Sequence, residues 1–197
     1  MSFPKADWQL IAFLVQKPPV GKRPIADISA NDTILRMALW QFVFDLVPAF
    51  AVTNAEVYVV RTDRNQLNGV KFGFALQDTN LLYARLNQLL PEKQSWADGL
   101  RIWGDERAHD IQVHFDACWI ELVQCRLDVR DPTPTLMNGV CALARDLSCV
   151  FVARDGGAVI QPCYEPLLRV MMQSRAIRFV NDPTTVLREA KPPLNGD

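Results

Sequence analysis

Hydrophobic and polar residues alternate most clearly between residues 124 and 130 of this 197-residue chain. Apolar side chains at positions 125, 127 and 129 are separated by Gln124, Arg126, Asp128 and Arg130. A period of two residues places the first set on one face of a β-strand and the second set on the other. The pattern therefore predicts a sheet with one face in a core and one face toward solvent or a partner.

Other apolar runs predict further strands, which turn residues separate. Asp155-Gly156-Gly157 is the clearest hairpin signal, and Asn68-Gly69 marks a longer connection between two strands. The predicted strands cover residues 8–16, 55–61, 70–76, 100–103, 111–115, 119–129, 149–153 and 158–161.

Segments with apolar residues at intervals of three and four predict helices. The predicted helices begin at Asn31 or Asp32, at about Asn80, at Thr133 or Thr135, at about Tyr164 and after Asp182-Pro183. The first would run to about Leu46 and is apolar on nearly every side, which is typical of a central helix or of an interface. A homodimer is the alternative that this helix raises.

The predicted strands gather in antiparallel hairpins, with helices between the groups. This arrangement predicts an α+β fold, with a mainly antiparallel sheet packed against about four helices. We expect one domain over residues 1–197, with a mobile tail at about 191–197. A division into two subdomains near residues 92–99 is the alternative.

Composition narrows the class of protein. The chain is 49% hydrophobic and 22% charged with a net charge of -1, unlike a disordered chain or a basic nucleic-acid binder. Its five cysteines contain no CxxC pair, so they indicate buried thiols in a reducing compartment. The apolar stretch at 34–52 contains Arg36, Gln41, Asp45 and Pro48, whereas a membrane span needs about 20 apolar residues. We therefore expect a cytoplasmic protein without a membrane or nucleic-acid partner.

The sequence lacks complete versions of the common catalytic and phosphate-binding motifs. Gly21-Lys22 is followed by Arg23 rather than the Ser or Thr of a P-loop, and no GxGxxG or GxSxG occurs. The two histidines, His109 and His114, would lie on opposite faces of a single strand. Cys118 could share a face with His114, but the nearby acids would raise its pKa. The sequence predicts no catalytic site, no metal site and no cofactor; a Cys, His and carboxylate site assembled by the fold stays open as an alternative.

Acidic residues are concentrated between positions 105 and 121, where five acids accompany one basic residue. Trp96, Trp103 and Trp119 lie beside this segment. Acids next to tryptophans favour contact with a partner protein, although a solvated edge would give the same composition. The predicted partner-binding residues are Trp103, Asp105, Glu106, Asp110, Asp116, Glu121, Arg126, Asp128 and Arg130.

The last third of the chain combines a DGG hairpin, a proline-led helix and several small, aromatic and Asp-Pro positions. These positions are Ser174-Arg175-Ala176, Phe179, Asp182-Pro183 and Leu187. This segment resembles the ends of bacterial immunity proteins that neutralise polymorphic or type VI secretion toxins. The resemblance implies a cytoplasmic inhibitor that binds its cognate toxin and blocks it, and it carries over no particular contact residue. An adaptor or chaperone that loads an effector for secretion is the second hypothesis, and a small enzyme the third.

Overall fold

The computed structural model describes residues 38–54, 57–58, 79–116 and 119–189. The described residues from Leu39 onward belong to one compact unit, which contains all the elements described below. The expected single domain over residues 1–197 and the expected mobile tail include residues outside the described part, so both stay predictions.

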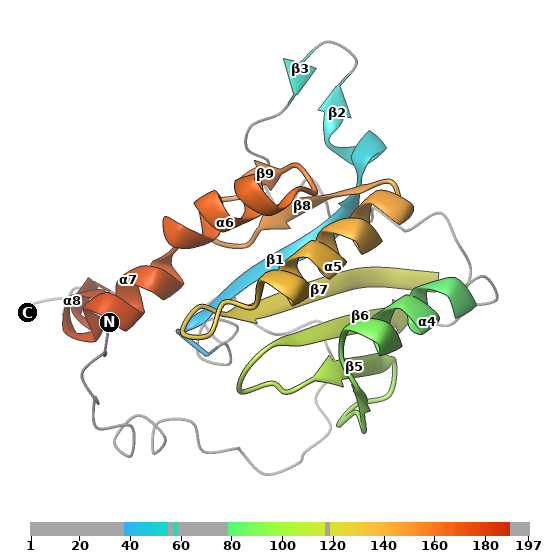
Figure 1. Ribbon diagram of the computed structural model, residues 1–197, viewed down its shortest axis with the longest axis horizontal. Helices are drawn as coiled ribbons and strands as arrows, with labels where there is room; N and C mark the ends of the chain where they lie inside the picture. Colours follow the sequence, from blue (N-terminus) through green and yellow to red (C-terminus); the bar gives the residue numbers. More distant parts are fainter. Residues whose placement is uncertain (1–37, 55–56, 59–78, 117–118, 190–197) are drawn as a thin grey trace, which may run out of the picture. The chain divides into compact units, whose positions relative to one another are not determined.

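A seven-stranded antiparallel sheet organises the unit, in the order β4-β5-β6-β7-β1-β8-β9 (Figure 1). The strand β1, inserted beside β7 and β8, is the one strand out of chain order. Both edges are only two residues long, and short edges limit pairing with other chains. The strands are β1 (Gln41–Pro48), β4 (Glu92–Lys93), β5 (Leu100–Gly104), β6 (Asp110–Asp116), β7 (Trp119–Asp128), β8 (Cys149–Ala153) and β9 (Val159–Ile160).

The helices cover one face of this sheet, as Figure 1 shows for α4, α5 and α6. They are α4 (Asn80–Leu89), α5 (Pro134–Asp146), α6 (Tyr164–Met172), α7 (Arg175–Asn181) and α8 (Pro183–Glu189). The core lies between the two layers, where Phe44 and Phe151 meet edge to face at 4.9 Å. The α+β fold with an antiparallel sheet is therefore confirmed. Within the described residues, no helix has the length and apolarity to cross a membrane.

The first predicted helix is wrong over its described part, because residues 41–48 form the central strand β1. All eight residues are buried, since helices cover one face and a second layer of buried side chains lies on the other. A strand buried on both faces is a continuous apolar run and loses the alternation that identifies a strand. Residues 41–48 are therefore not part of an apolar helix, and the oligomeric state, monomer or homodimer, stays a prediction.

The other predicted elements in the described part agree closely with the structure. Gly156 and Gly157 adopt φ angles of 76° and 65°, as the tight turn between β8 and β9 requires. The helix predicted to begin at about Tyr164 is divided: α6 ends at Met172, and Ser174 accepts a hydrogen bond from the Ile177 amide at 3.5 Å to begin α7. Residues 92–99, where a division into subdomains was the alternative, contain the edge strand β4.

Several predicted segments cannot be compared with the structure. The strands predicted at 8–16 and 70–76 lie outside the described residues, as does most of that at 55–61. Within the last of these, Val57–Tyr58 forms β3, which pairs with β2 (Thr53–Asn54) in a separate two-stranded sheet. A 3-10 turn at Ala49–Ala51 leads from β1 into β2.

Candidate functional site

A band of buried polar side chains crosses the sheet face that the helices leave open. We call it the polar band; its residues come from β1, β6 and β7, whose antiparallel register places them on the same face. It comprises Gln41, Asp45, Asp110, Gln112, Gln124, Arg126 and Asp128. Seven polar residues within a sheet layer are costly unless each has hydrogen-bonding partners.

Two ion pairs, one buried and one partly buried, supply partners to much of the polar band. Arg126 donates to both carboxylate oxygens of Asp110, with a distance of 2.7 Å from Nε to Oδ1, and Gln112 donates to Asp110 at 3.1 Å. Arg154, which follows β8, binds Asp45 at 3.0 and 3.1 Å. Burial raises the pKa of Asp110, whereas the hydrogen bonds and charge of Arg126 lower it. Arg126 is therefore the group that keeps a charged Asp110 compatible with the fold.

The turn between β5 and β6 folds over one end of the polar band. Gln41 donates from Nε2 to the carbonyl oxygens of Glu106 and Ala108, at 3.2 and 2.6 Å. Gly104 allows the turn to close, because its φ is 93° and a Cβ there would lie 2.3 Å from the carbonyl oxygen of His109. These contacts fix the backbone that carries Glu106.

Trp96 lies at the outer side of this turn. Its indole Nε1 donates to Glu106 Oε1 at 3.2 Å, and the same oxygen lies 3.6 Å from Arg126 Nη2. The side chain is nevertheless 65% exposed, the highest value among the described tryptophans. A chain of contacts thus runs from the buried Asp110, through Arg126 and Glu106, to an exposed aromatic ring. We call Trp96 and Glu106 together the Trp96 surface.

The predicted partner-binding residues occupy different environments. Trp103 is fully buried, donates to Asn87 Oδ1 at 2.7 Å and stacks on Tyr83, so it is a core residue rather than a surface anchor. The polar alternation of β7 is likewise not solvated, because Arg126 and Asp128 are 7% and 4% exposed.

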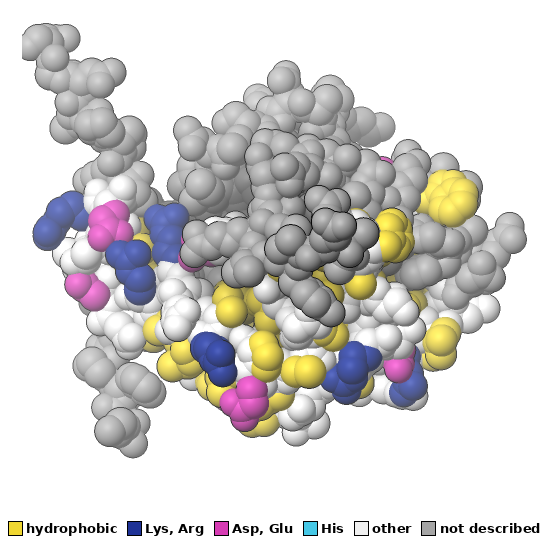
Figure 2. Space-filling model, turned by 90° about the horizontal axis from the view of Figure 1, so that it is seen from above, with side chains coloured by type: hydrophobic (Ala, Val, Ile, Leu, Met, Phe, Trp, Pro, Cys, Tyr) yellow, Lys and Arg dark blue, Asp and Glu magenta, His cyan; other side chains and the backbone are white. Residues whose placement is uncertain are grey.

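The remaining predicted residues are nearer the surface. Asp105, Glu121 and Arg130 are exposed, Glu106 is half-buried, and the side chain of Asp116 lies outside the described part. Asp105 is 4.0 Å from Lys93, and Arg130 binds Asp128. On the face that Figure 2 shows, basic and acidic side chains lie beside one another. Asp105 and Asp128 therefore have basic partners, and the role of the predicted residues in binding stays a prediction.

The histidines are held in the framework. His109 Nδ1 accepts the Asp128 amide hydrogen at 3.1 Å, and its Nε2 lies 3.3 Å from Thr133 Oγ1. His114 lies on the face of the polar band, where burial and the charge of Arg154 lower its pKa and Asp45 opposes them. Because neighbouring residues of a strand alternate, the Cys125 thiol lies on the other face of the sheet from His114. The Cys118 alternative falls outside the described residues.

The described thiols should differ sharply in reactivity. Burial raises the pKa of Cys141 to about 11 and that of Cys149 to about 12, and it raises the pKa of the fully buried Cys125 as well. Cys163, at the start of α6, is exposed.

In a Cys118→Ser variant at neutral pH, iodoacetamide is expected to modify Cys163 alone in the folded protein, because the thiolate is the reactive form. Peptide mass spectrometry measures this, with the urea-unfolded protein as the control; labelling of Cys125 in the folded state would contradict it.

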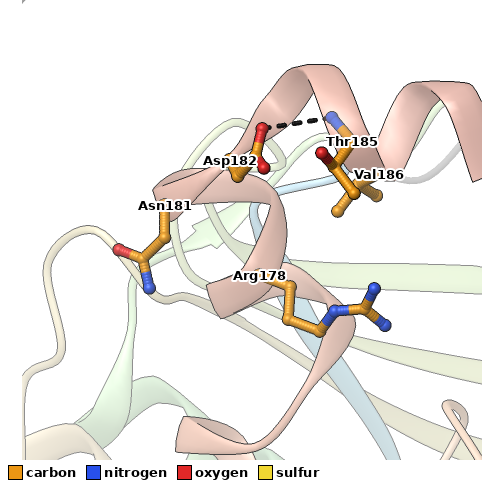
Figure 3. Close-up of a pocket in the computed structure, with 5 residues that line it drawn as sticks. All are labelled: Arg178, Asn181, Asp182, Thr185 and Val186. Atoms are coloured by element: carbon orange, nitrogen blue, oxygen red, sulfur yellow. Dashed lines mark hydrogen bonds between the residues drawn. The ribbon is translucent and has the colours of Figure 1, made fainter.

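A shallow pocket of about 210 Å³ lies between α7 and α8 (Figure 3). Its two charged side chains already have partners, since Asp182 accepts the Thr185 amide hydrogen at 3.1 Å and Arg178 pairs with Glu189 at 2.7 Å. Ligand pockets usually enclose at least about 300 Å³. The pocket is therefore explained by the capping of α8.

Comparison of the chain with protein-family models, with curated proteins and with solved structures found no match. Among the described residues, no group of three or more His, Cys, Asp or Glu side chains is placed to hold a metal ion. The sequence pattern predicted partner contacts in the acidic segment 105–121 and placed Trp96 beside it, but it did not include Trp96 among the predicted partner-binding residues. Its position in a loop between Pro91 and Gly99, outside the alternating strands, was the available signal.

Proposed function

We propose that this chain is a cytoplasmic immunity protein, which binds a cognate secreted bacterial toxin and blocks its activity. The observation that carries the binding part of the proposal is the exposed, hydrogen-bonded ring of Trp96. Tryptophan is enriched among the residues that dominate binding energy, and a ring held in place before binding loses little entropy when a partner covers it. The identification of that partner as a toxin rests on the resemblance of the C-terminal third.

The Trp96 ring is held by its surroundings as well as by Glu106. In the preceding turn, Ser95 Oγ donates to the Ala97 carbonyl at 3.0 Å and accepts its amide hydrogen at 3.2 Å. The loop returns to the sheet at Gly99, whose φ is 73° and whose carbonyl accepts the Phe115 amide hydrogen at 2.9 Å. Such support for a largely exposed aromatic residue is typical of a preformed binding surface.

The experiment is co-expression of the chain with the product of the neighbouring gene, followed by purification of the complex and assay of toxin activity. We expect a tight 1:1 complex, protection of the cells and loss of toxin activity. A complex in which the toxin stays active would instead indicate the effector-loading adaptor. Absence of both complex and protection would overturn the proposal.

Replacing Trp96 by alanine is expected to weaken the complex by about 2 kcal/mol, or roughly 30-fold, which calorimetry can measure. The free energy of unfolding should change by no more than about 0.5 kcal/mol, because the side chain is largely exposed. Leu81→Ala is the matched control: Leu81 is 61% exposed but lies on α4 in the helical layer. Equal losses of affinity in the two variants would show that the Trp96 surface has no special role.

A further inference from the structure

The Trp96 surface combines an open aromatic face with carboxylates. Glu106 uses Oε1 for its contacts with Trp96 and Arg126. Its Oε2 forms no hydrogen bond with any residue in the described part. Asp98, two positions after Trp96, is also exposed and forms no ion pair with a described residue. A ring face beside uncompensated carboxylate oxygens attracts a cation through the ring quadrupole and through charge.

The chain uses the same chemistry internally at two other aromatic residues. The Arg101 guanidinium lies 3.8 Å from the centre of the Tyr83 ring and binds both oxygens of Glu92, at 2.8 and 2.9 Å. Arg130 lies 4.5 Å from the centre of the Trp40 ring and binds Asp128. In both cases an arginine rests on an aromatic ring and pairs with a carboxylate. Trp96 and Glu106 present this ring and carboxylate, and no arginine in the described part of the chain lies over the ring.

Among the described residues, the basic side chains near the Trp96 surface do not complete it. Arg107 follows Glu106 in the turn, but its side chain makes no cation–π contact with Trp96. Arg126 is 7% exposed and directed at Asp110, so it approaches Glu106 from the buried side. Lys93 lies beside Asp105 at 4.0 Å. The described residues therefore leave the outward face of the ring open to a cation from another molecule.

We infer that the Trp96 surface takes up an arginine side chain of the bound partner, stacked on the Trp96 ring and paired with Glu106 Oε2. The inference rests on the proposed function in that the arginine belongs to the toxin. Arginine fits better than lysine because its planar guanidinium can stack and form hydrogen bonds at the same time. The recognised feature is thus an exposed arginine, on a basic segment of the partner.

The test measures binding of the peptide N-acetyl-Gly-Arg-Gly-amide to the full chain, by nuclear magnetic resonance of the tryptophan indole N–H groups. The chain contains five tryptophans, and Trp96→Phe identifies the Trp96 signal. We expect a saturable shift of this signal in the millimolar range, and binding of the matched citrulline peptide about tenfold weaker. Glu106→Gln should weaken arginine binding about fivefold while keeping an acceptor for the indole.

The outcomes separate the two proposals. Equal binding of the arginine and citrulline peptides, or no shift at about 20 mM peptide, would overturn the inference even if the toxin complex forms. A shift that is selective for arginine and depends on Glu106 supports the inference. If the neighbouring gene product nevertheless failed to bind, only the immunity proposal would be overturned. Trp119→Phe is the control, because a shift lost equally in that variant would place the peptide elsewhere and overturn the inference.

Discussion

Replacing Arg126 by alanine is expected to lower the free energy of unfolding by about 3–5 kcal/mol. The substitution leaves the Asp110 carboxylate, which is 1% exposed, without the two hydrogen bonds that Arg126 donates. Gln112 remains as a donor but cannot neutralise the charge. Urea unfolding followed by circular dichroism measures the change. Arg178→Ala is the control, because Arg178 and Glu189 are both more than half exposed and their pair should contribute at most about 1 kcal/mol.

The pH dependence of the Arg126→Ala variant distinguishes a lost charge partner from a cavity. Burial already raises the pKa of Asp110, and loss of Arg126 removes the main opposing interaction. As the pH falls from neutral toward the ordinary carboxyl pKa of 3.8, the folded variant takes up a proton at Asp110 before the unfolded chain does. The destabilisation relative to the unchanged protein should therefore shrink over this range. A difference independent of pH would show that lost packing dominates.

A double variant provides the complementary test. Asp110→Asn combined with Arg126→Met removes both charges and retains an oxygen acceptor for Gln112. It should be more stable than Arg126→Ala by about 1–3 kcal/mol, because no uncompensated charge stays buried. If the double variant were no more stable than Arg126→Ala, the uncompensated charge of Asp110 would not be the main cause of the lost stability.

The fold could be predicted from the sequence wherever local patterns determine the structure. Hairpin glycines, prolines that end strands and the alternation in β7 all depend on a few neighbouring residues. The prediction for the residues of β1 was wrong because their burial depends on parts of the chain that are distant in sequence. An apolar run that is buried on both faces has the same pattern as a buried helix. The pairing of β1 with β7 and β8 joins residues far apart in the chain, and no local pattern contains that information.

The candidate site could be predicted only as a region. Alternation in β7 identified which residues share a face, but it could not show that the polar face is buried rather than exposed to solvent. Arg126 is directed inward because Asp110, sixteen residues earlier, pairs with it across the β6–β7 register. Trp103 and Trp96 illustrate the same limit. Both flank the acidic segment, yet one faces α4 from a strand and the other emerges from a loop.

Trp103→Ala is expected to destabilise the chain by about 3–5 kcal/mol, the range for truncating a fully buried tryptophan. The substitution removes the ring that stacks on Tyr83 at 5.6 Å between centres, and it leaves Asn87 Oδ1 without its donor. Thermal unfolding of Trp103→Ala and Trp96→Ala under identical conditions measures the contrast. Trp103→Ala should lower the melting temperature strongly, whereas Trp96→Ala should leave it nearly unchanged. Below the melting temperatures of both variants, Trp96→Ala should weaken the complex with the partner more than Trp103→Ala does. If Trp103→Ala kept its stability but lost binding, Trp103 would be the surface anchor that the sequence first suggested.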